Sequence, residues 1–539
     1  MNTHVLIAVA AGLLLANLFA LLARQFWSPL RTVPGPFLTR LSSAWYAWKV
    51  WQGSFQEVNL ELHKKHGMSL VATIARIACQ IGARRLICTM NTGKIIRYGP
   101  NRYSINDLEA VKLIYGLGNP FPKFSWYSTW SSPGQWSLFA DQSLRRHAQN
   151  RKQYQATYSM TALVHYESFV DECANLFVRR LSEMSSAEIS LYIRHWFQCY
   201  AFDVIGMITY AKRLGFLDQG EDIGNVIGAL EDHLGYATVT GIFPGLHRFL
   251  FPIKNYLAGS KGAGRGYVIT FTYERVREAQ VKPRLAAVSE GDVATQDFLT
   301  KFLAKHAADP DNFTAYHVLS GCVSNMVAGS DTTAISLSAV LYYLLKNPSC
   351  MKELREEESQ QMPYLQAVIK EALRLHPATG LPLERVVPEG GATISGRFFP
   401  EGVTRRDENI FGDDADVFSP KRWLVDDANR VALMNRYWMP FGIGSRTCVG
   451  RHISMLDMCK LIPLLVRDFT FKLDNSLKTD DWHTQNYWFV KPLDFGVRAQ
   501  MRRARGSEKS KNTSSTGMYH ILNPRLQIDA DSRSAGAKR

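Results

Sequence analysis

The chain has 539 residues, of which 46% are hydrophobic and 21% are charged, and this ordinary globular composition excludes global disorder. Only one apolar run is long enough to span a bilayer, which excludes a polytopic transporter. Eight cysteines without a C-x-x-C pair exclude a disulfide scaffold and argue against a zinc ribbon. The net charge of +15 suits a nucleic acid, an anionic membrane or an acidic protein partner, and composition alone does not choose among them.

The apolar run occupies residues 5–23, where Asn17 is the only strongly polar residue, and with His4 the segment 4–23 has 20 residues. A helix of this length covers roughly the 30 Å hydrocarbon thickness of a bilayer. A cleaved signal peptide would have a positive segment before a shorter apolar core, and neither is present. Because Arg24 and further arginines follow the run, the positive-inside rule places the rest of the chain in the cytosol. Residues 1–30 are therefore predicted to be a membrane anchor and linker, followed by a stiff Pro34-Gly35-Pro36 elbow.

Hydropathy periodicity predicts one mainly α domain with small β regions near each end, over residues 31–501. Two short strands, 94–98 and 102–105, flank a Gly-Pro-Asn turn, and residues 383–403 are also strand-like. Residues 502–539 are rich in Ser, Gly, Lys and Arg, which predicts a basic, disordered tail. The clearest helical patterns cover 55–65, 107–116, 142–182, 188–211, 266–280, 314–346, 349–357 and 363–376.

The sharpest motif is Phe441-Gly442-Ile443-Gly444-Ser445-Arg446-Thr447-Cys448-Val449-Gly450. Its glycines allow a tight turn against a flat partner. Cys448 comes just before a helical run, where the positive end of the helix dipole favours thiolate, the form of cysteine that binds metal. Arg446 adds positive charge that suits an anionic ligand. A lone cysteine near glycines is more often a buried small hydrophobe, but ten matched positions outweigh that interpretation.

Two further motifs lie on predicted helices. Glu371 and Arg374 have the i,i+3 spacing that puts a carboxylate and a guanidinium on one helix face, although most such pairs are solvated and contribute at most about 1 kcal/mol. Ala328-Gly329-Ser330-Asp331-Thr332-Thr333 lies inside the long helix 314–346. Glycine and consecutive threonines there favour a bulge, because threonine hydroxyls bond back to helix carbonyls. Alone, this pattern would be a tolerated helix irregularity.

Together these motifs resemble those of the cytochrome P450 family, and the resemblance covers about residues 34–500. It is strongest toward fungal microsomal members, of which the pisatin-demethylase-like group is the nearest that we can name. The resemblance implies a cytochrome P450 fold with an N-terminal transmembrane helix, and a haem b whose iron is ligated by the Cys448 thiolate. It also implies that Phe441, Gly442, Arg446 and Gly450 contact the haem. In this family, the counterparts of Glu371, Arg374 and Arg422 stabilise the fold behind the haem.

The resemblance assigns further roles. Ala328 and Gly329 would form an oxygen-binding groove in which Asp331 and Thr332 relay protons. His147, Arg151 and Arg385 resemble residues that hold the haem propionates, although each could be a surface cation. Aromatic residues line the substrate pocket or simply fill the core, and the candidates for the pocket are Trp126, Trp136, Trp488 and Phe489, with Tyr127, Trp130 and Tyr487 in the same two segments.

Three places depart from the family pattern. Compared with the family pattern, residues 68–93 are an insertion, a loop and short helix are missing between 358 and 359, and a strand is missing between 403 and 404. One retained intron and two skipped coding stretches would explain all three, and uninterrupted transcript reads matching this sequence would refute that hypothesis.

The leading hypothesis is a haem-thiolate monooxygenase, held in the endoplasmic reticulum membrane by residues 4–23. It would insert one oxygen atom from O2 into a small lipophilic natural product in fungal secondary metabolism or detoxification. Electrons would come from NADPH through NADPH–cytochrome P450 reductase, whose acidic docking face suits a basic partner. The three departures keep open a non-catalytic haem protein. A haem-thiolate isomerase or dehydratase is a third hypothesis, disfavoured by the Asp331–Thr332 pair. Nucleic-acid binding is rejected.

Overall fold

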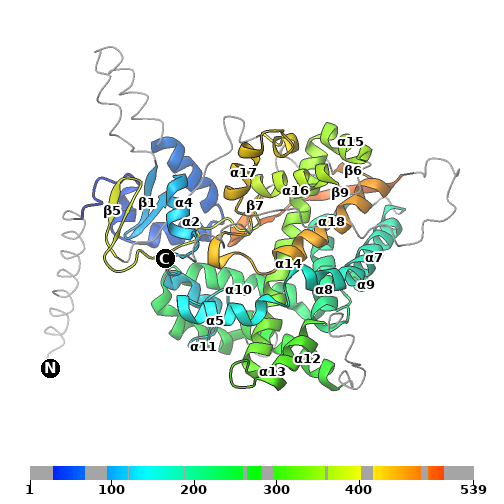
Figure 1. The fold of residues 1–539 in the computed structure, drawn as a ribbon, viewed down its shortest axis with the longest axis horizontal. Coiled ribbons are helices and arrows are strands. Elements are labelled where there is room, and N and C mark those ends of the chain that lie inside the picture. Colours follow the sequence, from blue (N-terminus) through cyan, green and yellow to red (C-terminus); the bar gives the residue numbers. More distant parts are fainter. Residues whose placement is uncertain are drawn as a thin grey trace, which may run out of the picture.

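The computed structural model describes residue 12 and the ranges 28–66, 94–118, 121–186, 189–258, 264–281, 297–357, 362–401, 417–474 and 483–502. Helices dominate these residues, and the strands form small sheets, of which β1–β2 lies to one side and β7 lies among the helices (Figure 1). The mainly α fold with small β regions is therefore as predicted.

Helices form where apolar periodicity and end signals agree. For example, Asp107 and Ser143 accept backbone N–H groups at the helix starts that follow them. Residues 55–66 are helical. The α-helices are α2 (Ala44–Trp51), α4 (Leu108–Tyr115), α5 (Leu144–Gln155), α6 (Met160–Leu163), α7 (Glu167–Ser185), α8 (Ile193–Tyr210), α9 (Phe216–Gln219), α10 (Val226–Thr240), α11 (His247–Ala258), α12 (Gly264–Val281), α13 (Phe298–Ala308), α14 (Ala315–Lys346), α15 (Pro348–Glu356), α16 (Pro363–Leu375), α17 (Ala428–Tyr437) and α18 (Arg451–Asp468). Short 3-10 turns are η1 (Phe37–Arg40), η3 (Ser125–Trp130), η4 (Val164–Tyr166), η5 (Ile223–Asn225), η6 (Pro244–Leu246), η9 (Pro420–Trp423) and η10 (Gly444–Arg446).

The strands pair antiparallel in small separate sheets. They are β1 (Ile95–Gly99), β2 (Arg102–Ile105), β3 (Leu191–Tyr192), β4 (Ala392–Ile394), β5 (Arg397–Phe399), β6 (Phe469–Leu473), β7 (Thr484–Tyr487), β8 (Phe489–Pro492) and β9 (Gly496–Met501). Hairpins β1–β2, β4–β5 and β7–β8 each stand alone among the described residues, and β9 lies between β3 and β6. The predicted hairpin around Gly99 is confirmed, with Ile95 paired to Ile105.

Two predicted helices differ from the structure. The segment 142–182 is three pieces, α5, α6 and α7, because the chain turns over residues 156–159 and again at η4. The segment 188–211 begins with the short strand β3 before α8. Both errors have the same cause: a continuous apolar pattern does not reveal a local change of chain direction.

The core is built around α14, which runs through the middle of the helical body (Figure 1). Buried residues along almost its whole length pack against α8, α12, α16 and α18. A second cluster of buried aromatic residues joins α2, η3, α10 and the β7–β8 hairpin. The 32 residues of α14 are mostly apolar on every side of the helix. This pattern explains why α14 is buried along its length rather than amphipathic.

Several predicted features fall outside the described residues. The predicted anchor at 4–23 does so except for Gly12, and no described helix combines the length and hydropathy needed to cross a bilayer. The apparent insertion 68–93, the junctions 358–359 and 403–404, and the tail after Arg502 also fall outside them.

Candidate active site

Cys448 lies in a tight loop that connects α17 to α18. Gly442 and Gly444 have φ values of +68° and +67°, in the left-handed region that favours glycine. A Cβ atom at Gly444 would overlap the carbonyl oxygen of Tyr115. The backbone N–H of Cys448 donates to the carbonyl of Phe441 over 2.8 Å, which closes the loop. The sequence therefore folds here as its glycines predict.

The Cys448 side chain borders open space. Burial raises the pKa of its thiol, while the backbone N–H groups of Gly450 and Arg451 and the charge of Arg151 act in the opposite direction. The side chain is nevertheless exposed, and a Cβ atom at Gly450 would have no neighbour within 4 Å. The backbone N–H groups at the start of α18 thus favour thiolate, and burial opposes them. A metal ion would have to displace the proton.

Cationic side chains gather beside this space. Burial lowers the pKa of Lys123 well below its usual value, and the charges of Arg385 and Arg446 lower it further. The pKa of His147 falls to about 3 because of burial and the charges of Arg446, Lys123 and Arg151. The structure therefore brings together His147, Arg151, Arg385 and Arg446, as the sequence predicted, and adds Lys123.

Few anions balance the cationic cluster (Lys123, Arg151, Arg385 and Arg446), and His147 beside it is neutral because its pKa is lowered. The Asp141 carboxylate is engaged by Arg146 in two hydrogen bonds of 2.8 Å. Arg446 Nη1 donates to the Asp141 carbonyl at 2.8 Å, and its buried Nη2 has no partner among the described residues. Buried guanidinium groups without a counter-charge are costly, so the cluster is suited to bind an anionic ligand.

The middle of α14 forms another wall of the site. Ala328 is exposed and Thr332 is partly exposed, although α14 is otherwise buried. The Thr332 hydroxyl donates to the Ala328 carbonyl over 2.7 Å. Gly329 packs against Ile205 of α8. The expected bulge is absent: α14 is α-helical throughout, because a carbonyl can accept a hydroxyl in addition to its helical N–H.

Asp331, next along α14, is buried and points away from Thr332. Gln198 of α8 donates to its Oδ1 over 2.6 Å, and Lys491 Nζ of β8 lies 3.0 Å from its Oδ2. The structure therefore does not join Asp331 and Thr332 by a hydrogen bond. The contact with Lys491 was missed by sequence reasoning, since 160 positions separate the two residues.

Buried aromatic rings from η3 and the β7–β8 hairpin pack as one cluster. The ring centroids of Trp126, Trp130 and Trp488 lie 5.0–5.6 Å from one another. Trp488 turns the β7–β8 hairpin with φ of +81°, a strained conformation for a residue with a side chain. Phe489 is buried beside it. Trp136 is not in this cluster: it packs against Tyr316 and His317 at the start of α14, roughly 16 Å along the helix from Ala328.

A buried ion-pair cluster lies under the Cys448 loop, on α16. Arg374 Nε donates to Glu371 Oε2 over 2.9 Å, and Arg422 Nε donates to Oε1 over 2.8 Å. The Trp423 ring N–H and the Ser419 backbone N–H complete the carboxylate's partners at 2.9 and 3.0 Å. The contacts among Glu371, Arg374 and Arg422 are the ones expected from the sequence.

Comparison with known proteins agrees with this geometry. The family model "Cytochrome P450" matches residues 95–493. The chain belongs to the cytochrome P450 family. This P450 is 35% identical to a pisatin demethylase of Fusarium vanettenii over 88% of this chain and 90% of the relative. It is 35% identical to a cytochrome P450 monooxygenase of Aspergillus terreus (70% of this chain and 82% of the relative). It is also 30% identical to the cytochrome P450 monooxygenase gsfF of Penicillium aethiopicum (88% and 94%). The protein is therefore an oxidoreductase of the monooxygenase class.

The family implies a haem with thiolate ligation and electrons from a redox partner, and the residues present fit that group. A haem carries two carboxylates and an iron that takes a protein ligand. The P450 offers an accessible thiol, and a buried guanidinium nitrogen that has no partner within the described part of the chain. Cys448 would hold the iron, and the cationic cluster would hold the carboxylates.

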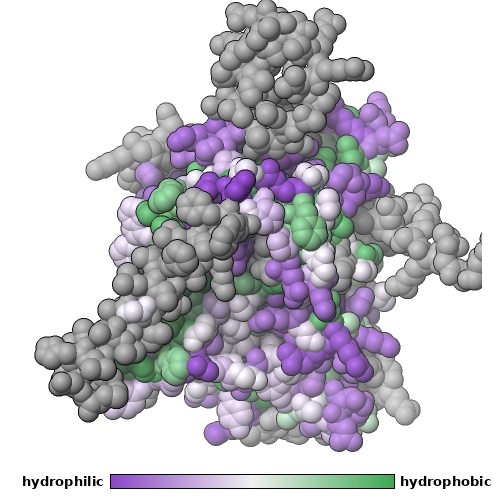
Figure 2. Space-filling view, turned by 90° about the vertical axis from the view of Figure 1, so that its left-hand side faces the viewer, coloured by the Kyte–Doolittle hydropathy of each residue, from purple (hydrophilic) through white to green (hydrophobic). Residues whose placement is uncertain are grey.

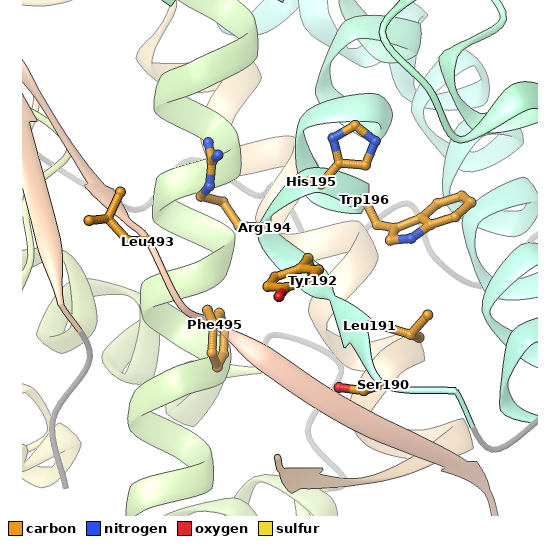
Figure 3. A pocket seen from close by; sticks show the side chains of 8 residues that line it. All are labelled: Ser190, Leu191, Tyr192, Arg194, His195, Trp196, Leu493 and Phe495. Atoms are coloured by element: carbon orange, nitrogen blue, oxygen red, sulfur yellow. The ribbon is translucent and has the colours of Figure 1, made fainter. Parts of the chain in front are cut away.

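A separate pocket lies on the far side of α8 from this site. Its volume is about 390 Å³, and Figure 3 shows Tyr192 and Phe495 at its centre with Arg194 beside them. Its lining contains no predicted site residue; the lining is Ser190, Leu191, Tyr192, Arg194, His195, Trp196, Leu493 and Phe495. This pocket is therefore not the site of the P450 chemistry.

Proposed function

We propose that this P450 uses haem b ligated by Cys448 to insert one oxygen atom from O2 into a small lipophilic natural product of fungal secondary metabolism. The observation that carries the proposal is that the accessible Cys448 thiol lies beside Arg151 of the cationic cluster, and that α14, with its accessible stretch, contacts the helix that follows Cys448. Relatives that are named P450 monooxygenase or pisatin demethylase support a monooxygenase acting on such a compound. Demethylation of a methoxy group is one form that such an oxidation takes.

Each part of the site then has a role. When bound, the haem supplies the activation of O2 and the oxidation of the substrate. Lys123, Arg385 and Arg446 bind the propionates and are neutralised by them, which removes the unbalanced buried charge. Thr332 presents a hydroxyl, and Asp331 is the acid through which a proton passes from solvent. The tryptophan cluster excludes water and gives a lipophilic substrate a flat apolar wall.

We also propose that electrons come from NADPH–cytochrome P450 reductase and that residues 4–23 anchor the chain in the endoplasmic reticulum membrane. The apolar sequence of the segment 4–23 and the net charge of +15 support this. Exposed apolar side chains add support: α11 carries Phe249, Ile253, Tyr256 and Leu257, of which Tyr256 is 86% exposed. Hydrophobic areas are visible on the face in Figure 2. Exposed patches of this kind mark membrane or protein contacts.

The membrane proposal is tested by fractionating cells that express the full chain. The anchor predicts that the P450 stays in the membrane pellet after alkaline carbonate extraction, because a spanning helix resists that treatment. Release of the chain into the supernatant would contradict a spanning anchor.

The catalytic proposal is tested by co-expressing the full chain with the reductase and supplying NADPH, O2 and candidate substrates. Pisatin and 7-ethoxycoumarin are suitable first compounds, since each reports oxidation beside an ether oxygen. We expect a product that is heavier by one oxygen or that has lost an alkyl group, and no product from Cys448→Ser. Bound haem with no NADPH-dependent product from any compound would favour the non-catalytic alternative. Conversion without NADPH would favour an isomerase or dehydratase.

A further inference from the structure

The acid on α14 is held by a lysine from a distant strand. Lys491 of β8 places its ammonium 3.0 Å from Asp331 Oδ2. The approach is an ion pair without hydrogen-bond alignment, because Oδ2 has no hydrogen-bond partner among the described residues. Oδ1 accepts from Gln198 over 2.6 Å. Oδ2 therefore keeps the capacity to take a proton while the charge of Asp331 is balanced.

The same lysine also contacts a carboxylate at the surface. Lys491 Nζ lies 3.2 Å from Glu231 Oε1 of α10. The exposed fractions of the side chains fall in order along this row, from 48% for Glu231 to 12% for Lys491 and 2% for Asp331. The three residues therefore form a row of charged groups that leads from solvent to the interior acid.

Two carboxylates sharing one ammonium give the row two states. When Asp331 is ionised, Lys491 balances both acids partially. When Asp331 is protonated, its attraction for the ammonium is lost, and Lys491 is left with Glu231. A lysine head on a flexible four-carbon stem can make this shift without backbone movement. Breaking a buried ion pair by removing one partner is costly, so the Asp331 carboxylate depends on Lys491.

We propose that Lys491 is a positioning residue for proton delivery to the P450 site, and that Glu231 is its surface partner. This rests on the monooxygenase function proposed above. In each turnover RH, O2, NADPH and H⁺ become ROH, H2O and NADP⁺, so two electrons and two protons accompany the oxygen atom that leaves as water. Asp331 gives up a proton toward that oxygen and is reprotonated from solvent. Lys491 orients the carboxylate and balances its charge between these events.

The hairpin location of Lys491 links proton delivery to the substrate wall. Lys491 lies three residues from Trp488, the strained residue that turns β7 into β8. Asn486 of the same hairpin is fixed by Gln56 and by the Gly53 carbonyl. A substrate that contacts Trp488 therefore contacts the same short hairpin that carries Lys491, and Asn486 fixes that hairpin in place.

The test compares Lys491→Met, Lys491→Arg and Glu231→Gln with wild type in the full-length enzyme. Asp232→Asn is the matched control, because Asp232 adjoins Glu231 on α10, is 44% exposed and pairs with Lys254 at 2.9 Å. The probe is 7-ethoxycoumarin, oxidised either with NADPH and reductase or with hydrogen peroxide. Peroxide brings its own two protons and electrons, so that route does not need delivered protons.

We expect Lys491→Met to keep the carbon monoxide difference band and peroxide-driven activity. It should form at least about tenfold less product per NADPH, with more hydrogen peroxide released and a larger solvent deuterium isotope effect. Lys491→Arg should restore most coupling, Glu231→Gln should be intermediate, and Asp232→Asn should match wild type.

Equal product per NADPH and equal isotope effects in Lys491→Met and wild type would overturn the inference. Equal losses in the NADPH and peroxide reactions would also overturn it, because they indicate a structural role. A wild-type enzyme without the carbon monoxide band or without oxidation by either route would instead contradict the proposed function.

Discussion

Glu371→Gln should destabilise the fold far more than the loss of one surface charge. The carboxylate is fully buried and accepts five hydrogen bonds, from Arg374 Nε and Nη2, Arg422 Nε, Trp423 Nε1 and the Ser419 backbone N–H. Glutamine has almost the same shape, so the change isolates charge and acceptor number. It leaves two guanidinium groups buried without a counter-charge and turns an NH2 group toward donors.

The expected cost is about 3–5 kcal/mol, the range measured when one partner of a buried ion pair is removed. A domain is stable by about 5–15 kcal/mol in total, so the variant should be marginally folded. Burial raises the pKa of Glu371, but hydrogen bonds from Arg374 and Ser419 outweigh burial and leave the pKa below its usual 4.5. The carboxylate therefore stabilises the protein above pH 4.5, and this advantage is lost as the pH falls through its lowered pKa.

Urea denaturation of the purified variants, followed by far-UV circular dichroism, measures the cost. The matched control is Glu183→Gln on α7, which breaks an i,i+3 pair with Arg180 at 2.6 Å in which Glu183 is 52% exposed. We expect the control to lose less than about 1 kcal/mol. If Glu371→Gln and Glu183→Gln differ from wild type by similar small amounts, the argument from the buried cluster is refuted.

Further predictions concern single residues. Lys123→Met should leave the apoprotein as stable as wild type or more so, because it removes a buried cation. The same variant should release haem faster than wild type in a transfer assay to apomyoglobin. An unchanged rate of haem release would contradict a propionate role for Lys123. Burial lowers the pKa of His376 to about 4, so the unfolded state binds the proton first as the pH falls from 6.5 to 4. Urea titrations should therefore show that His376→Gln loses less stability than wild type over this pH range, by up to about 3 kcal/mol. Parallel curves of stability against pH for the two proteins would count against this. Trp488→Ala should cost about 3–5 kcal/mol and raise KM for an aromatic substrate more than it lowers kcat; an unaltered KM would place Trp488 in the core alone.

The chemistry of the chain could be predicted where it is encoded in local sequence. The Cys448 loop depends on glycines at fixed positions, and Glu371 and Arg374 are one helical turn apart, so spacing alone predicts their contact. The β1–β2 hairpin around Gly99 is equally local. Each of these is set by backbone conformation within a few residues.

The remaining features depend on packing between distant segments, which one sequence does not reveal. Lys123 has no motif, and only the fold brings it beside Arg385, with which it forms a β-bridge. Lys491 meets Asp331 because β8 lies beside α14. Trp136 lies in the same aromatic-rich segment as Trp126, but its ring packs against His317 at the start of α14. The effect of burial on the pKa of Cys448 also comes from packing, whereas the helix terminus that opposes it is visible in the sequence.

The most direct test of the account is a reduced, carbon monoxide difference spectrum of microsomes that contain the full-length chain. Ligation of haem iron by the Cys448 thiolate predicts the red-shifted Soret band of a haem-thiolate protein, and its loss in Cys448→Ser with the chain still expressed. Absence of the band from the wild-type chain, or its persistence in Cys448→Ser, would contradict the assignment of this loop as the haem site.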